Sequence, residues 1–107
     1  MRLSECPVRA AIDVIEGKWK PIIVNALKAK PLRFGQLCRE TPEASKKVLT
    51  AQLRELEREE LICRKDFGNA EAHRRYALTP HGRTLVPVLA QMAKWGAAHR
   101  NRHTDTR

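Results

Sequence analysis

The chain has 107 residues and a formal net charge of +9, from 21 Lys and Arg against 12 Asp and Glu. This length fits one domain, and a hydrophobic share of 42% supplies one small core, which excludes a wholly disordered chain. No apolar run approaches the roughly 20 residues of a membrane-spanning helix, and the N-terminus lacks the apolar segment of a signal peptide. We therefore expect a cytoplasmic protein with a polyanionic partner, nucleic acid first and an acidic membrane surface second.

Residues that support catalysis or metal binding do not form recognisable groups in the sequence. The cysteines Cys6, Cys38 and Cys63 are an odd number and include no CxxC pair, so we expect neither a disulfide framework nor a zinc site. There is no glycine-rich phosphate loop, no carboxylate cluster and no Ser/His/Asp grouping. We expect a protein that is not an enzyme and that needs no cofactor.

The first two predicted helices flank Gly17. Apolar positions spaced i, i+3, i+4 and i+7 indicate a helix from Cys6 to Ile15, which Gly17 ends. A second helix is expected from about Lys18 to Lys30, and Pro31 stops it. The expected buried residues of the second helix are Trp19, Ile22, Ile23, Ala26 and Leu27.

A short helix, a turn and a polar-faced helix come next. An extended link, Leu32-Arg33, leads to a helix from Phe34 to Arg39 or Glu40, and Thr41-Pro42-Glu43 predicts a turn. Ser45 is a good N-cap for the fourth helix. The apolar side of this helix carries Val48, Leu49, Leu53 and Leu56. Its other side carries Lys46, Lys47, Thr50, Ala51, Arg54 and Arg58. Ion pairs within the helix are expected among Arg54, Glu55, Glu57 and Arg58.

Alternating polarity predicts a β-hairpin after the fourth helix. A strand from Leu61 to Phe67 can pair with one from His73 to Leu78, and Gly68-Asn69 breaks the run between them. A short helix, a tight turn, a polar-faced helix and a hairpin, in this order, describe a winged helix-turn-helix. We therefore expect a mostly α-helical fold with a small β-hairpin wing.

The last predicted helix starts at Thr79-Pro80, runs to about His99 and is kinked at Pro87. Its apolar stripe is long for one face of so small a domain, so we expect part of it and the first helix to form a subunit interface. The expected interface residues are Val8, Ile12, Leu89, Met92 and Trp95. Residues 1–100 then form one domain with dimerisation helices at both ends, and residues 101–107 form a polar tail.

The fourth helix and the wing carry groups that bind DNA. A helix fits the major groove, where Lys47 and Arg54 can reach guanine N7 and O6, and Thr50 and Ala51 can touch a thymine methyl. The expected DNA contacts of the helix are Ser45, Lys46, Lys47, Thr50, Ala51 and Arg54. The expected contacts of the wing are Lys65, His73, Arg74 and Arg75. The competing interpretation is a charged helix face that meets only solvent.

Several separated motifs resemble the HxlR-type winged helix-turn-helix regulators, a MarR-like family. These motifs are Cys6-Pro7, Asp13 to Trp19, Leu32 to Leu37, Ser45 to Glu57, Tyr76 to Thr79, Gly82-Arg83 and Pro87 to Gly96. The resemblance covers Cys6 to His99 and implies a bacterial homodimeric transcription factor on a partly palindromic operator. We expect a repressor whose half-sites lie about ten base pairs apart.

The wing departs from the family pattern. Family members commonly read Pro-Pro-Lys/Arg-Val-Glu-Tyr there, whereas this chain reads Glu71-Ala72-His73-Arg74-Arg75-Tyr76. The prolines are absent and a basic residue replaces the acidic one before the tyrosine. We therefore expect a more mobile and more basic wing.

Cys6 is the candidate sensor of an oxidant or electrophile. It precedes Pro7 at a helix N-terminus, with Arg2 and Arg9 close in sequence, and these conditions favour a reactive thiolate. The resemblance implies the same role, because several family members sense oxidants or electrophiles through a cysteine at this place. The competing interpretation is a small apolar side chain packed under the first helix.

Two other functions compete with sequence-specific regulation. A winged helix can serve as a protein–protein interaction module without specific DNA binding, and the charge of +9 can support nonspecific nucleic-acid binding. An interaction module would tolerate the loss of Lys47 or Arg54 and would need an apolar surface patch. Apart from the charge, nothing in the sequence supports membrane binding.

Overall fold

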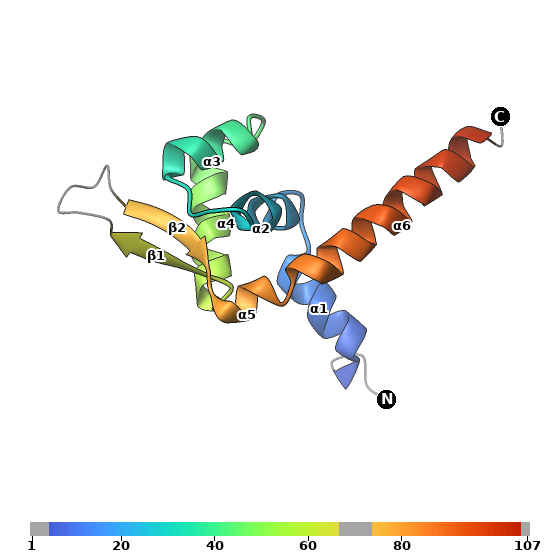
Figure 1. Cartoon of the computed structure of the whole chain (residues 1–107), viewed down its shortest axis with the longest axis horizontal. Helices are drawn as coiled ribbons and strands as arrows, with labels where there is room; N and C mark the ends of the chain where they lie inside the picture. Colours follow the sequence, from blue (N-terminus) through green and yellow to red (C-terminus); the bar gives the residue numbers. More distant parts are fainter. Residues whose placement is uncertain (1–4, 67–73, 106–107) are drawn as a thin grey trace.

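The chain forms a small helical body with a β-hairpin on one side and two helices that extend from the other (Figure 1). The computed structural model describes residues 5–66 and 74–105, with side chains as far as Arg102. In chain order the elements are α1 (Pro7–Ile15), α2 (Lys20–Leu27), α3 (Phe34–Glu40), α4 (Lys46–Arg58), β1 (Ile62–Asp66), β2 (Arg74–Leu78), α5 (Pro80–Arg83) and α6 (Val86–Asp105). The mostly helical fold with a hairpin wing is confirmed.

The hydrophobic core lies between α2, α3, α4 and the base of the wing. One face of α4 is fully buried in it, because its leucines recur every three or four residues. Burying each such side chain stabilises the fold by about 1.5–3 kcal/mol. The buried core cluster consists of Ile23, Val24, Leu27, Leu32, Leu37, Leu49, Leu53, Leu56, Leu61, Ile62 and Leu78.

Two residues that we expected in the core lie on the surface. Ile22 of α2 is 41% exposed and Val48 of α4 is 42% exposed. In α2 the buried stripe passes through Ile23 and Val24 instead, so Ile22 faces a groove between α2 and α6. In α4 the buried stripe begins at Leu49, which leaves Val48 at its edge.

The helix ends follow their sequence signals. Ser45 Oγ accepts a hydrogen bond of 3.0 Å from the backbone N–H of Val48, which caps α4. Thr79 Oγ1 accepts one of 2.9 Å from the backbone N–H of Gly82, which caps α5. Such caps each contribute about 0.5–2 kcal/mol. Between α1 and α2, Gly17 has a φ of 110°, a conformation that side-chain-bearing residues rarely adopt.

The wing is anchored to the body through Tyr76. β1 and β2 pair antiparallel with Arg64 opposite Tyr76. Leu32 exchanges two backbone hydrogen bonds with Tyr76, of 3.0 and 2.8 Å, so the predicted extended link lies against β2 as a third strand-like segment. The described strands start at Ile62 and Arg74, and residues 67–73, which hold the expected turn and His73, lie outside the described residues.

The predicted single last helix is wrong, because the chain breaks it in two. α5 ends at Arg83 and α6 begins at Val86, so Pro87 lies in the first turn of α6 and kinks no continuous helix. Proline lacks the N–H that a helix interior needs, whereas a first turn loses nothing by its absence. α6 continues to Asp105, past the expected end at His99, and α2 is shorter than expected at both ends.

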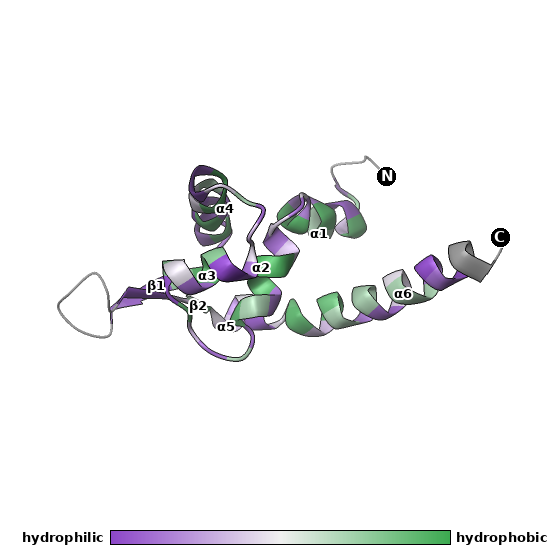
Figure 2. Cartoon of the chain, turned by 90° about the horizontal axis from the view of Figure 1, so that it is seen from above, coloured by the Kyte–Doolittle hydropathy of each residue, from purple (hydrophilic) through white to green (hydrophobic). Residues whose placement is uncertain are grey.

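α6 points away from the body, and only its first turns pack against it (Figures 1 and 2). Figure 2 shows hydrophobic residues along its first half and along α1. The large apolar residues left exposed on these two helices are Val8, Ile12, Val88, Met92 and Trp95. No helix in the described part of the chain is long and apolar enough to cross a membrane.

Gly82 provides a test of how α5 packs on the base of the wing. A Cβ added at Gly82 would lie 2.0 Å from the carbonyl oxygen of Leu61, so Gly82→Ala forces the backbone apart. We expect Gly82→Ala to lower the free energy of unfolding in urea by at least about 2 kcal/mol. Gly35→Ala is the control, since its Cβ meets nothing within 4 Å and should stabilise α3 by about 0.5–1 kcal/mol. Equal stability of the two variants would contradict this packing.

Candidate nucleic-acid interface

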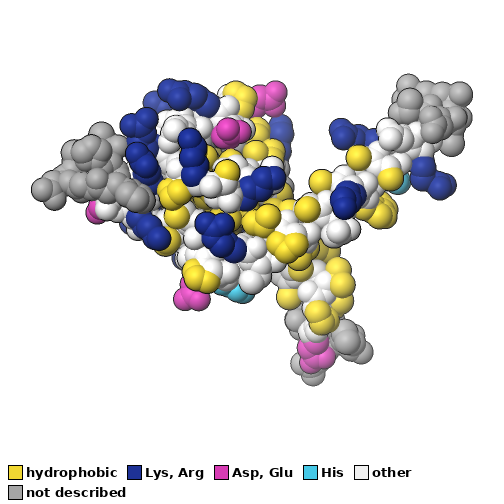
Figure 3. Space-filling model, in the orientation of Figure 1, with side chains coloured by type: hydrophobic (Ala, Val, Ile, Leu, Met, Phe, Trp, Pro, Cys, Tyr) yellow, Lys and Arg dark blue, Asp and Glu magenta, His cyan; other side chains and the backbone are white. Residues whose placement is uncertain are grey.

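The polar face of α4 is presented outward because the opposite face is buried. Ser45, Lys46, Lys47, Ala51 and Arg54 are exposed and Thr50 is half-buried. Lys and Arg side chains gather over α3, α4 and the adjoining wing in the face that Figure 3 shows. The expected contact residues of the fourth helix therefore share one accessible surface.

Two grooves lie side by side between α4 and the wing, and Thr50 and Tyr76 line both of them. The groove on the α3 side, here the α3 groove, is lined by Arg33, Phe34, Gly35, Gln36, Arg39, Thr50, Arg74 and Tyr76. The groove along the second half of α4, here the α4 groove, is lined by Thr50, Arg54, Glu57, Arg58, Arg64 and Tyr76. Each groove therefore presents three arginines, a surface suited to phosphate.

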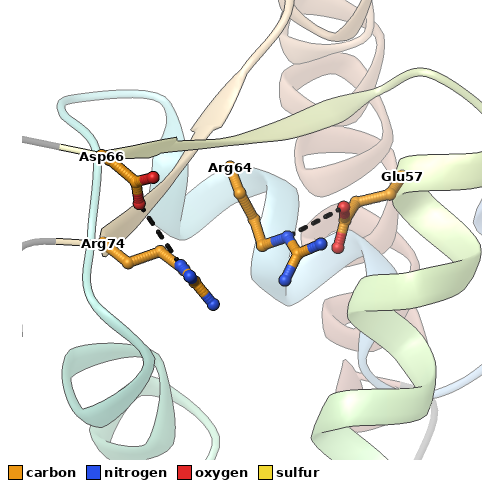
Figure 4. Close-up of polar contacts among 4 residues, drawn as sticks. All are labelled: Glu57, Arg64, Asp66 and Arg74. Atoms are coloured by element: carbon orange, nitrogen blue, oxygen red, sulfur yellow. Dashed lines mark hydrogen bonds and ion pairs between the residues drawn. The ribbon is translucent and has the colours of Figure 1, made fainter. Parts of the chain in front are cut away.

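Two arginines of these grooves are paired with carboxylates (Figure 4). Arg64 Nε lies 3.4 Å from Glu57 Oε2, and Arg74 Nε lies 3.3 Å from Asp66 Oδ1. Both pairs are partly open to solvent, and such pairs contribute about 0–1 kcal/mol. The pair of Glu57 joins α4 to β1, so the ion pairs that we expected within α4 are wrong for this residue.

A second carboxylate of α4 fixes the helix against α2. Lys20 Nζ lies 3.1 Å from Glu55 Oε2, and the Lys20 side chain is only 11% exposed. Gln52 Nε2 donates a hydrogen bond of 3.0 Å to the same oxygen. This contact, which is shielded on the Lys20 side, helps to hold the rotation of α4. The sequence did not lead us to Lys20 because its partner lies on another element.

Tyr76 separates the two grooves, and its environment favours the neutral phenol. Partial burial raises the pKa of Tyr76 above 10.0, and the negative charge of Glu57 raises it further. Arg64 and Arg74 act in the opposite direction to a smaller extent. The side chain therefore stays an uncharged hydrogen-bonding group on the floor of a cationic surface.

The structure brings most of the expected contact residues together and adds others. Thr50, Arg54 and Arg74 line the grooves, Lys65 is exposed on β1, and Arg75 is half-buried opposite Lys65. The residues that line the grooves and that the sequence analysis did not single out are Arg33, Gln36, Arg39, Arg58, Arg64 and Tyr76. The strand register was the available signal for Arg64, since pairing it with Tyr76 turns both toward α4.

Cys6 lies far from these grooves. It is the N-cap of α1, directly before Pro7 in the first turn, and it is partly exposed. α1 and the wing are at opposite sides of the molecule (Figures 1 and 2). Cys38 and Cys63 are also free and partly buried, and Cys38 packs against the core.

A short helix, a turn, a polar-faced helix and a basic hairpin on one face define a winged helix-turn-helix domain. The sequence profile of the HxlR-like helix-turn-helix family matches residues 14–104. The chain belongs to this family, as its motifs indicated, and is a transcriptional regulator of the helix-turn-helix type.

Relatives and solved structures agree with this assignment. The chain is 39% identical over 97 residues to the uncharacterized HTH-type transcriptional regulator YdeP of Bacillus subtilis, covering 91% of this chain and 76% of that regulator. It is similar to the redox regulator HypR in its reduced form, with a TM-score of 0.86, 36% identity, and coverage of 94% and 99% of the two chains. It is also similar to quinone-bound YodB of B. subtilis, with a TM-score of 0.74, 29% identity, and coverage of 87% and 99%.

The single tyrosine of the chain allows its titration to be measured without interference from another phenol. We expect the tyrosinate absorbance of the native protein to rise at a higher pH than that of the denatured protein, because burial and Glu57 raise the pKa of Tyr76. Above pH 10 the unfolded chain then releases this proton first, so the Tyr76 contribution to stability falls as pH rises. Glu57→Gln should lower the native midpoint. A native midpoint at or below the denatured one would contradict this environment.

Proposed function

We propose that the chain is a homodimeric, sequence-specific DNA-binding repressor that acts in the cytoplasm and responds to an oxidant or electrophile through Cys6. The observation that carries the DNA-binding part is the outward polar face of α4, flanked on both sides by grooves that each present three arginines. Nonspecific binding needs only charge, but a helix with exposed Lys and Ala side chains and a half-buried Thr on its outer face offers groups that distinguish bases.

In this proposal α4 reads the major groove. Lys47 and Arg54 donate to guanine N7 and O6, while Thr50 and Ala51 contact thymine methyl groups. Lys46 binds a neighbouring phosphate. Ser45 Oγ already accepts from the Val48 N–H, so its own hydroxyl proton is available to donate to a phosphate.

The wing and α3 hold the DNA backbone. Lys65, Arg74 and Arg75 bind phosphates from the wing, together with Arg33 and Arg39 from the α3 groove. His73 belongs to the same proposal but lies outside the described residues. These contacts position the protein on DNA without reading its sequence.

The homodimer is proposed to form through α1 and α6. Val8, Ile12 and Met92 are exposed apolar residues on these helices, and Trp95 is 69% exposed. Leu89 continues the same stripe and packs partly against the core of its own chain. Covering such a stripe with its two-fold copy removes apolar surface from water, and it sets two α4 helices to enter major grooves about 34–36 Å apart.

The sensing role of Cys6 rests on its place and on the relatives. It is a partly exposed N-cap directly before the first turn of α1, so its thiol is accessible to an oxidant or electrophile. HypR is a redox regulator and YodB was solved with a quinone bound. Because α1 also belongs to the proposed dimer interface, modification of Cys6 would change the spacing of the two α4 helices.

DNA recognition is tested by fluorescence anisotropy on the duplex upstream of the chain's own gene and on a scrambled duplex, at two salt concentrations. We expect Lys47→Ala and Arg54→Ala each to cost about 1–3 kcal/mol on the upstream duplex and less on the scrambled one. Lys94→Ala removes the same charge from α6 and should change neither. A footprint with two half-sites about ten base pairs apart would support the dimer. Wild-type affinity in both α4 variants would favour a protein-interaction module.

Redox sensing is tested on the same duplex after treatment with hydrogen peroxide or a quinone. We expect the wild-type protein to lose its sequence-specific binding and Cys6→Ser to keep it, because serine has no thiolate to be oxidised or alkylated. Cys63→Ser serves as the control and should stay as sensitive as the wild type. Equal sensitivity of Cys6→Ser and the wild type would remove Cys6 from the mechanism.

A further inference from the structure

One carboxylate lies within the otherwise cationic DNA-binding face. Among the described residues that line the two grooves, Glu57 is the only acidic one, and the other charged residues there are arginines. Along the polar face of α4, Arg54 follows Thr50 by four residues and Glu57 follows Arg54 by three. A phosphate that approaches the arginines of the α4 groove therefore also approaches this negative charge.

Glu57 forms an ion pair with Arg64 in the lining of the α4 groove. The contact joins Oε2 of Glu57 to Nε of Arg64 at 3.4 Å, and it bridges α4 and β1 (Figure 4). The Arg64 side chain is 51% exposed, so its position alone would allow it to meet a DNA phosphate. The pair removes the net positive charge that Arg64 would otherwise add to the groove.

The second acidic residue of Figure 4 does not stand in the same position. Asp66 pairs with Arg74, but Asp66 is 64% exposed at the end of β1 and lines neither groove. Asp66 therefore places no carboxylate in the lining of the α3 groove, although it remains paired with Arg74. Among the described residues, only the α4 groove has a carboxylate in its lining, that of Glu57.

We propose that Glu57 is a specificity-determining residue that limits sequence-independent DNA binding by holding Arg64 away from the phosphate backbone. This inference rests on the proposed DNA-binding function and adds a limit to it. Nonspecific affinity grows with each phosphate that a cation neutralises, and chromosomal DNA offers a great excess of such sites. A carboxylate in the cationic face lowers this affinity, while the base-reading side chains of α4 are left unchanged.

The test measures the salt dependence of binding to one random-sequence duplex by anisotropy. We expect Glu57→Gln to free Arg64 for one more phosphate, which steepens the slope of log K against log salt by about 0.9 and tightens binding roughly fivefold to tenfold at 0.1 M salt. Arg64→Gln alone should leave the slope unchanged. Adding Arg64→Gln to Glu57→Gln should remove the gained slope.

Glu59→Gln is the matched control, because Glu59 is exposed at the end of α4 and lines neither groove. It makes the same change in net charge and should leave the slope as in the wild type. The urea midpoint and far-UV circular dichroism of each variant report that the fold is intact.

Three results would overturn the inference. The first is an equal effect of Glu57→Gln and Glu59→Gln on the salt slope. The second is a flatter slope for Arg64→Gln alone than for the wild type, which would mean that Arg64 already contacts phosphate. A gain in Glu57→Gln that survives the second substitution is the third. These results leave the proposed function standing, which depends on discrimination between the upstream and scrambled duplexes. A wild-type chain that binds no duplex would overturn both.

Discussion

The burial of one face of α4 is the constraint on which the rest of the molecule depends. Leu49, Leu53 and Leu56 are almost completely inaccessible, so the helix has one possible rotation about its axis. The contact of Lys20 with Glu55 favours the same rotation, because the largely buried Lys20 charge would otherwise lack a partner. Core packing and polar anchoring thus agree, and the opposite face must meet solvent or DNA.

The wing takes its position from the same body. The backbone of Tyr76 pairs with Leu32 on one side and with β1 on the other, while its side chain forms the floor shared by both grooves. One residue therefore connects the link before α3, the hairpin and the surface beside α4. The spacing between α4 and the wing is set by backbone hydrogen bonds, which are stiffer than surface ion pairs.

The sequence predicts whatever is encoded by local spacing, and less of what depends on contacts between elements. The leucine stripe and the cap of α4 follow from residue order near Ser45, and both are confirmed. Pairing of Glu57 with Arg64 needs the strand register, so expecting it within α4 was wrong. The apolar pattern also did not predict the break between α5 and α6, just before Pro87. The apolar stripe continues across this break, and periodicity alone cannot distinguish a kinked helix from two helices.

Gly17 gives the molecule a mechanical property. Its φ of 110° turns the chain sharply between α1 and α2, and of the α1 residues only Ile15, beside this turn, is buried. At about 1.5 Å per residue, α1 is a lever of roughly 13 Å with its pivot at Gly17. A rotation of about 10° there moves the Cys6 end by roughly 2 Å. In the proposed dimer, a small rotation at Gly17 would therefore produce a larger displacement at the interface between the subunits.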